Sequence, residues 1–243
     1  TGIYDSVNAM IGSTEAAGVA ELRRELSAER LTARVGRDGA KAQQRTADLL
    51  KLYADAVGAR SLSNGLIKEL AKAHGVKLPE KPTPLKATIR ILEKALLRPD
   101  APGKVDKICD VVRDMLTCEG MAGIAALVRA FLDDERIVVV RVKDRFDTPS
   151  GGGWRDVMIN YYHVADGAKH VCEVQIVHSS LLTARKGLPG HAIYNVVRNA
   201  NELLECVGLE KEGRPKGVAV CSRVEWLVEV LGEDQEPVVR LAA

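Results

Sequence analysis

Three strand-like stretches decide the fold: RIVVVRVKDR at residues 136–145, RDVMINYYHV at 155–164 and HVCEVQIV at 170–177. All three are rich in β-branched or aromatic residues, which favour extended strands. Asp166 and Gly167 separate the second stretch from the third, and this dipeptide is typical of a tight hairpin turn. The sequence therefore predicts a β-sheet that contains an antiparallel pair.

Helical and extended patterns alternate around these stretches. A further strand is expected at 107–118 and a helix at 121–132, and a helical tract follows the last strand over 179–206. This order predicts an α/β fold with a mixed β-sheet and flanking helices. A fully parallel, doubly wound sheet would not accommodate the hairpin.

The first 80 residues are expected to form a helical N-terminal region. Residues 13–59 are rich in Ala, Leu, Glu, Arg and Lys, and Gly36 and Gly39 are expected to separate two helices. A third helix is expected to start with Ser63 as its cap and to end near Gly75.

A cluster of prolines marks the expected domain boundary, because Pro79, Pro82 and Pro84 interrupt the helical pattern. Thr83 and Pro84 also form a natural start for a helix over 84–97. We therefore expect a helical region at 1–80, an α/β domain at 81–210 and a C-terminal extension at 211–243.

Composition limits the classes of function. The 243 residues carry 35 Lys and Arg against 33 Asp and Glu, a net charge of +2, so any phosphate site must be a local cluster of basic residues.

The longest apolar stretch, 121–132, is shorter than the roughly 20 residues that a membrane span needs. The start of the chain does not resemble a secretory signal. The five cysteines form no C-x-x-C pair, which favours reduced thiols and a cytoplasmic location.

Two groups of basic residues are candidate phosphate ligands. On the helix expected at 84–97, Lys86, Arg90 and Lys94 recur every four residues and share one face. On the strand expected at 136–145, three cations recur every second residue on one face, where they repel one another unless anions are supplied. These are Arg141, Lys143 and Arg145. A solvated helix face and a solvated strand face are the alternatives.

A glycine-rich loop precedes the strand expected at 155–164. It presents Trp154 and then Arg155, and an indole face can stack on a nucleobase for roughly 1–3 kcal/mol per base. The alternative is a linker with a Trp in the core.

Two carboxylates fall inside apolar stretches. Glu173 and Gln175 share one face of the last predicted strand, and Asp110, with Arg113 three residues on, lies in the strand expected at 107–118. Such a pair could bind Mg²⁺ or accept a proton from an attacking hydroxyl. Pairing of Glu173 with a cation for structural reasons is the alternative.

Taken together, these pieces resemble the synthetase domain of the RelA/SpoT family of alarmone nucleotidyltransferases, over about residues 84–206. The segments that carry the resemblance are Asp110-Val111-Val112-Arg113, Arg141-Val142-Lys143-Asp144, Gly153-Trp154-Arg155-Asp156, Glu173-Val174-Gln175-Ile176 and Gly190-His191-Ala192-Ile193-Tyr194. The resemblance implies a nucleotidyltransferase-like domain at 81–210 that transfers a pyrophosphoryl group from ATP to the 3′-hydroxyl of a purine nucleotide.

The resemblance also implies roles for individual residues. Asp110 and Glu173 would be the catalytic residues and would hold Mg²⁺, with Glu173 able to activate the hydroxyl instead. The nucleotide and its phosphates would be bound by a larger set: Lys86, Arg90, Lys94, Arg113, Arg141, Lys143, Arg145, Trp154, Arg155, Gln175, His191 and Tyr194. We expect the cations and the two carboxylates to face one cleft with Trp154 at its rim.

The sequence departs from the family pattern at several positions. Pro84 and Met115 stand where the family has arginines, and Asp156 replaces the serine of the glycine loop.

Two hypotheses about function follow from the resemblance and from these departures. The protein is a divergent Mg²⁺-dependent pyrophosphoryl or nucleotidyl transferase, or it is a catalytically inactive module that binds nucleotide, RNA or protein partners within a larger complex. In the second case the N-terminal helices would be an interaction appendage.

Overall fold

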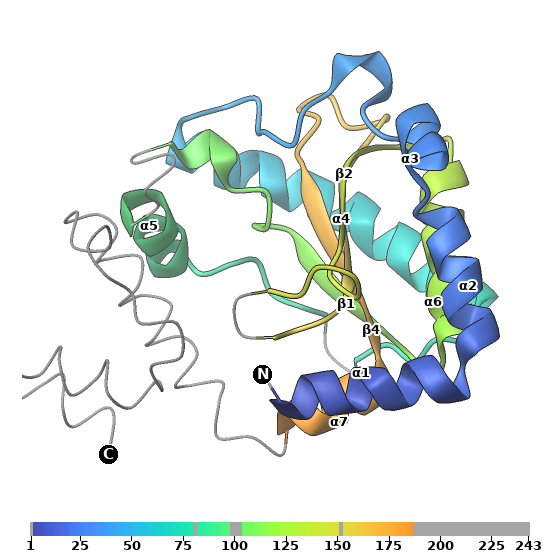
Figure 1. Ribbon diagram of the computed structural model, residues 1–243. Coiled ribbons are helices and arrows are strands. Elements are labelled where there is room, and N and C mark those ends of the chain that lie inside the picture. Colours follow the sequence, from blue (N-terminus) through green and yellow to red (C-terminus); the bar gives the residue numbers. More distant parts are fainter. Residues whose placement is uncertain (1, 80–81, 98–103, 151–152, 187–243) are drawn as a thin grey trace, which may run out of the picture. The chain divides into compact units, whose positions relative to one another are not determined.

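The computed structural model describes residues 2–79, 82–97, 104–150 and 153–186 (Figure 1). Within these ranges four strands form one sheet in the order β1-β4-β3-β2. Their bounds are Arg113–Cys118 for β1, Ile137–Asp144 for β2, Val157–His163 for β3 and Cys172–His178 for β4. Strand β1 is parallel to β4, and β3 is antiparallel to both of its neighbours. This sheet confirms the predicted mixed α/β class.

Seven α-helices accompany the sheet in the described part of the chain. Their bounds are Gly2–Thr14 for α1, Ala16–Glu25 for α2, Ala28–Arg34 for α3, Leu49–Ala73 for α4, Thr88–Leu97 for α5, Met121–Asp133 for α6 and Ser179–Lys186 for α7. Two short 3₁₀ turns cover Arg37–Gly39 and Val105–Lys107. None of the described helices combines the length and apolar character that a membrane span requires.

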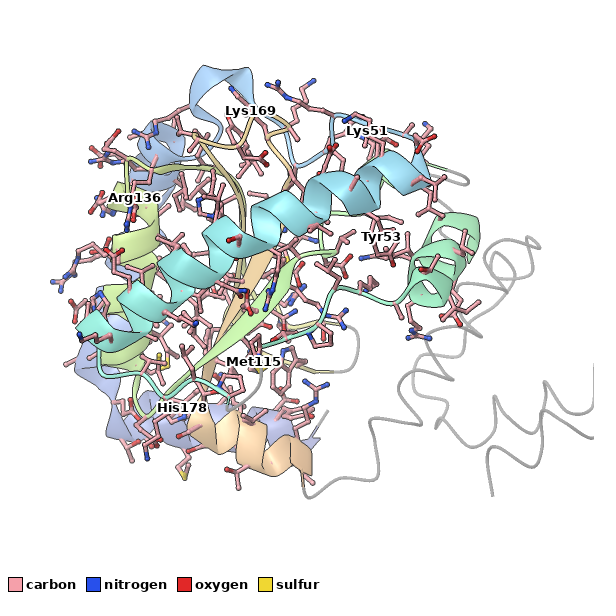
Figure 2. The ribbon with its side chains drawn as sticks, turned by 180° about the vertical axis from the view of Figure 1, so that it is seen from behind. Lys51, Tyr53, Met115, Arg136, Lys169 and His178 are labelled. Carbon is pink, nitrogen blue, oxygen red and sulfur yellow. The ribbon has the colours of Figure 1, made fainter. Side chains whose placement is uncertain are left out.

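The hydrophobic core covers one face of the sheet, between the strands and helices α4 and α6; Figure 2 shows α4 running across this face. Tyr161 of β3 is fully buried here. Its ring centroid lies 5.6 Å from that of Phe131 in α6, and its hydroxyl lies 2.8 Å from Ser63 Oγ in α4. Because side chains alternate along a strand, Asn160 and Tyr162 point to the opposite face.

The N-terminal helices share this core. Ile11, Leu22 and Leu52 belong to the same buried cluster as the sheet residues, and α2 packs closely along α6. Glu15, just before α2, accepts a hydrogen bond of 2.6 Å from the backbone N–H of Met121 at the start of α6. The hydrophobic core therefore includes residues from both sides of the boundary expected near residue 80.

Three sequence predictions about element boundaries are wrong. Ser63 caps no helix, because it lies buried inside α4. The N-cap of α4 is Asp48, whose carboxylate accepts a hydrogen bond of 2.7 Å from Lys51 N. The helix expected from Pro84 starts only at Thr88, because Lys86 N donates to Val111 O at 3.0 Å and holds the preceding residues outside the helix.

The strand expected at 107–118 starts at Arg113, so Asp110 precedes the strand instead of lying within it. The side chain of Gln44 captures the preceding carbonyl of Ile108 at 3.0 Å, which removes that group from any strand ladder.

Other predictions are confirmed. The three strand-like stretches form β2, β3 and β4, and Asp166 supports the β3–β4 turn by accepting hydrogen bonds from Ala168 N and His170 N. Gly36 and Gly39 have positive φ and lie between α3 and α4. Most of the helical tract expected at 179–206, and the C-terminal extension at 211–243, lie outside the described residues.

Candidate functional site

A row of polar side chains crosses the sheet on the face opposite the core. The register pairs Arg113 of β1 with Glu173 of β4, Glu173 with Asn160 of β3, and Asn160 with Arg141 of β2. Paired residues on neighbouring strands project from the same face of a sheet. The register therefore brings together three residues that the sequence singled out and adds Asn160.

A second row lies two residues further along the strands. It pairs Gln175 of β4 with Met115 of β1 and with Met158 of β3, and Met158 with Lys143 of β2. This face thus carries Gln175 and Lys143 beside Glu173 and Arg141, but Met158 lies between Gln175 and Lys143 and Met115 lies on the other side of Gln175.

Asn160 organises the centre of the first row. Its side chain is fully buried, and Oδ1 accepts a hydrogen bond of 2.9 Å from Arg141 Nε. Its Nδ2 donates to the carbonyl oxygens of Cys109 and Cys172, both at 3.2 Å. One amide therefore orients Arg141 and ties the segment before Asp110 to β4. Sequence reasoning missed Asn160, although an amide among the apolar and aromatic residues of VMINYYH was the available signal.

Asp110 is held by two lysines, one from the segment before α5 and one from α5 itself. Lys86 Nζ donates to Oδ2 at 2.7 Å, and Lys94 Nζ lies 2.9 Å from Oδ1. Burial alone would raise the pKa of Asp110, but the charges of Lys94 and Lys86 outweigh it and hold the pKa well below its usual range. These two charges therefore favour the ionised form of Asp110.

Glu173 has the opposite electrostatic character. Burial raises the pKa of its carboxyl, and the negative charge of Asp110 raises it further. Gln175 Nε2 donates a hydrogen bond of 2.9 Å to Oε1, which offsets part of this effect. The two carboxylates are close enough to repel each other, and their pKa values are displaced in opposite directions, a pattern typical of sites that move protons or hold cations.

The predicted basic stripe is only partly formed. Lys86 precedes the first helical residue of α5, so the three cations do not lie along one helix. Lys86 and Lys94 nevertheless meet at Asp110, whereas Arg90 forms an ion pair with Glu93 at 2.5 Å. Burial and the positive charge of Lys94 lower the pKa of Lys86, although Asp110 opposes this.

The residues of the glycine loop form a cluster of their own. Asp156 is fully buried, pairs with Arg145 at 3.0 Å and accepts a hydrogen bond of 2.8 Å from Trp154 Nε1. The guanidinium of Arg185 lies 4.9 Å from the centroid of the Trp154 ring, and Tyr4 meets the same indole edge-on. Trp154 is thus packed against α1 and α7, and one ring face already carries a cation.

The remaining predicted residues are dispersed. Arg155 donates to Phe146 O and pairs with Asp5 of α1, away from the carboxylates. His191 and Tyr194 lie outside the described residues. The binding roles of all these side chains remain predictions.

Asp110 and Glu173 offer the donor atoms that Mg²⁺ prefers, since carboxylate oxygens are its usual protein ligands. Their mutual repulsion is what a cation between them would relieve. Both oxygens of Asp110 already face ammonium groups, so a metal there would share the carboxylate with Lys86 and Lys94. In the described part of the chain no group of three or more His, Cys, Asp or Glu residues is arranged to hold a metal.

No model of a known protein family matches the sequence, and no curated protein matches it. Solved structures do match. Small alarmone synthetase 1 from Bacillus subtilis is 16% identical, with a TM-score of 0.50 over 76% of this chain and 97% of that one. The Type VI effector Tas1, in complex with its immunity protein, is 20% identical, with a TM-score of 0.45 over 72% of this chain and 90% of that one.

Small alarmone synthetase 2 from Bacillus subtilis is 17% identical, with a TM-score of 0.43 over 67% of this chain and 97% of that one. At these identities the likeness concerns the fold. The chain has the RelA/SpoT-like fold of small alarmone synthetases, as the sequence motifs predicted.

Proposed function

We propose that this protein is a Mg²⁺-dependent transferase that moves a pyrophosphoryl group from ATP to a hydroxyl of a purine nucleotide. The observation that carries the proposal is the Asp110–Glu173 pair, two buried carboxylates whose pKa values are displaced in opposite directions. Glu173 lies on the cation-bearing sheet face, and Asp110 lies in the segment just before β1. A buried carboxylate with a purely structural role is normally paired with a cation of its own. Glu173 forms no ion pair with any described residue.

The reaction demands positioning and neutralisation of charge more than covalent chemistry. The acceptor hydroxyl oxygen would form a bond to the β-phosphorus of ATP, the bond from that phosphorus to the α–β bridging oxygen would break, and AMP would leave. Glu173, with its raised pKa, would take the hydroxyl proton. Arg141, oriented by Asn160, and Lys143 would bind phosphate oxygens.

Asp110 and Glu173 would hold Mg²⁺, which supplies positive charge to the phosphate oxygens when bound. Lys86 and Lys94 then have a second use. With Mg²⁺ bound beside Asp110, the ammonium groups of Lys86 and Lys94 would also be able to contact the phosphate chain of the substrate.

A second candidate function is a nucleotide-binding module without activity. It is favoured by the same ion pairs, because both oxygens of Asp110 are engaged, and by the cation already stacked on Trp154.

Transfer of label from ATP separates these functions. The chain is incubated with Mg²⁺, a panel of purine nucleotides and tRNA, and ATP labelled at the α-, the β- or the γ-phosphate. Movement of the β- and γ-labels together, with release of AMP, supports pyrophosphoryl transfer, and movement of the α-label indicates nucleotidyl transfer. Absence of both from every acceptor, with retained nucleotide binding, supports the inactive module. The variant Glu173→Gln should abolish transfer, while Glu29→Gln, at an exposed position of α3, should not.

A further inference from the structure

A cavity of about 340 Å³ lies apart from the carboxylate pair, between the segment that follows α3 and the start of β4. Its lining includes Lys41, Gln43, Arg45, Tyr162, Lys169 and Val171. Figure 2 shows Lys169 at this end of the molecule. Tyr162 lies two residues beyond Asn160 in β3, on the same sheet face, about 7 Å along the strand.

A small hydrophobic cluster separates the cavity from the carboxylates. It consists of Cys109, Val138, Val140, Tyr162 and Val171, with Ala40 and Ala42 packed on it. The cavity is therefore a distinct site on the same face and not an extension of the Asp110–Glu173 pair.

The charge of the lining is entirely positive. Lys41, Arg45 and Lys169 face the cavity, and no Asp or Glu lines it. Among the described residues none of these three cations forms an ion pair with a carboxylate, whereas Lys86, Lys94 and Arg145 are each paired. Three unneutralised cations around one concave site repel one another, and a bound anion would relieve that repulsion.

The wall that carries two of the cations is held rigidly although it is neither helix nor strand. Gln44 is buried, and its Nε2 donates to Ile108 O and Val171 O, both at 3.0 Å. Its Oε1 accepts from Val171 N at 2.9 Å. Lys41 and Arg45 flank this anchor, so the backbone on which they stand is fixed in advance of any ligand.

The third cation is held by a strained backbone. Lys169 has φ of 48°, and it is the one non-glycine residue with positive φ in the described part of the chain. Its Nζ lies 5.2 Å from the centroid of the Tyr162 ring, over the floor of the cavity. Backbone strain of this kind is concentrated at functional sites, where it aims a side chain at a ligand.

We propose that this cavity is a second anion site, which binds the di- or triphosphate chain of a small molecule. Two lysines act as point charges and one arginine offers a planar fork, the combination that suits a chain of phosphates. The volume is that of a small-molecule site. A nucleic-acid backbone fits less well, because it needs an extended basic surface and the whole chain carries a net charge of only +2.

The test is a titration of pyrophosphate, followed by ¹H–¹⁵N spectra and by calorimetry on the full chain. The backbone amides of residues 41–45 and 169 and the side-chain amide of Gln43 should shift. The triple variant Lys41→Ala/Arg45→Ala/Lys169→Gly should lose these shifts and bind at this site at least tenfold more weakly. Glycine at 169 tolerates the positive φ, so the fold should be retained.

The matched control removes three other exposed cations, through Arg24→Ala/Lys68→Ala/Lys72→Ala, and should leave the shifts unchanged. Lys143→Ala should also leave them unchanged, since that residue belongs to the carboxylate face. Unshifted amides at 41–45 and 169, or shifts that survive the triple variant, would overturn the proposal. So would equal affinity for orthophosphate and pyrophosphate, or binding of an RNA oligonucleotide without binding of pyrophosphate. Because no turnover is measured, failure of the transferase proposal would leave this result standing.

Discussion

Lys86 Nζ lies 2.7 Å from Asp110 Oδ2, so the segment before α5 is tied through a single carboxylate to the segment before β1. Lys86 is largely buried in this contact. A buried ammonium group that loses its counter-charge leaves an uncompensated charge in a poorly solvated place. Asp110 is therefore important for the stability of the fold as well as for any chemistry.

The variant Asp110→Asn is expected to lower the free energy of unfolding by about 3–5 kcal/mol at pH 7, because it leaves Lys86 and Lys94 beside a neutral amide. Urea denaturation measures the change. Asp55→Asn is the matched control, since Asp55 pairs with Lys51, which is mostly exposed, and such pairs contribute about 0–1 kcal/mol. Equal, small effects of the two substitutions would contradict the assignment.

The stability contributed by Asp110 should depend on pH in a defined direction. Its pKa is lowered by folding, so its contribution is fully present above the pKa of an unfolded Asp, about 3.9, and is lost as the pH falls towards the lower folded value. The difference in unfolding free energy between the unmodified protein and Asp110→Asn should therefore shrink below about pH 4. A difference that stays constant between pH 7 and pH 3 would exclude this linkage.

Asn160→Ala is expected to reduce the free energy of unfolding by about 2–4 kcal/mol, because two buried carbonyls and Arg141 lose their partner at once. Any transferase activity should fall as well, since Arg141 is no longer oriented. A double-mutant cycle with Arg141→Ala isolates the contact between the two side chains. Purely additive effects of the two substitutions on both stability and turnover would argue against a positioning role.

The strands could be predicted from the sequence because their β-branched and aromatic stretches are local signals, and the hairpin at Asp166 is local too. The polar face of β4 could also be predicted, since Glu173 and Gln175 alternate with apolar neighbours. The register that places Arg113 beside Glu173 could not be predicted, because it joins segments 60 residues apart.

The boundary errors come from contacts with distant parts of the chain that override a local pattern, and at the start of α5 that contact is the backbone hydrogen bond from Lys86 N to Val111 O. Gln44 holds the segment before β1 out of a strand, and Tyr161 draws Ser63 into the middle of a helix. The base-stacking role of Trp154 remains a prediction, but its contact with Tyr4, from the other end of the domain, was not predicted. No residue type near Trp154 in the sequence indicates that contact.

Gly18→Ala should destabilise the contact between α2 and α6. A Cβ atom at residue 18 would lie 2.6 Å from the backbone nitrogen of Ala122, so one helix must move. We expect a loss of about 1–3 kcal/mol in the free energy of unfolding. Gly58→Ala in α4 is the control, because nothing lies within 4 Å of its Cβ position and alanine favours the helix there. A thermal melt should show Gly18→Ala lower, and Gly58→Ala equal to or above, the unmodified protein.

Glu173→Gln distinguishes chemistry from architecture, because it keeps the shape of the side chain and removes its charge. If Glu173 holds a metal or accepts the proton, turnover should fall by about 10²-fold or more. Stability should rise, since the substitution relieves burial of a charge and repulsion from Asp110. A carboxyl whose pKa is raised by folding destabilises the protein only where it is ionised. The gain in melting temperature should therefore be largest near pH 8 and fade as the pH falls through the raised pKa.

The control for this variant is Glu29→Gln, at an exposed position, which should change neither turnover nor the pH profile of stability. The sequence offers Arg113 and Arg155 as alternative structural partners of Glu173. Arg155 binds Phe146 O and Asp5 instead, and Arg113, which lies beside Glu173 in the register, forms no ion pair with it in the described part of the chain. Melts are recorded with and without Mg²⁺ and nucleotide. A melting temperature that drops at pH 8, with no ligand-dependent shift in either protein, would exclude the catalytic role and favour the inactive module.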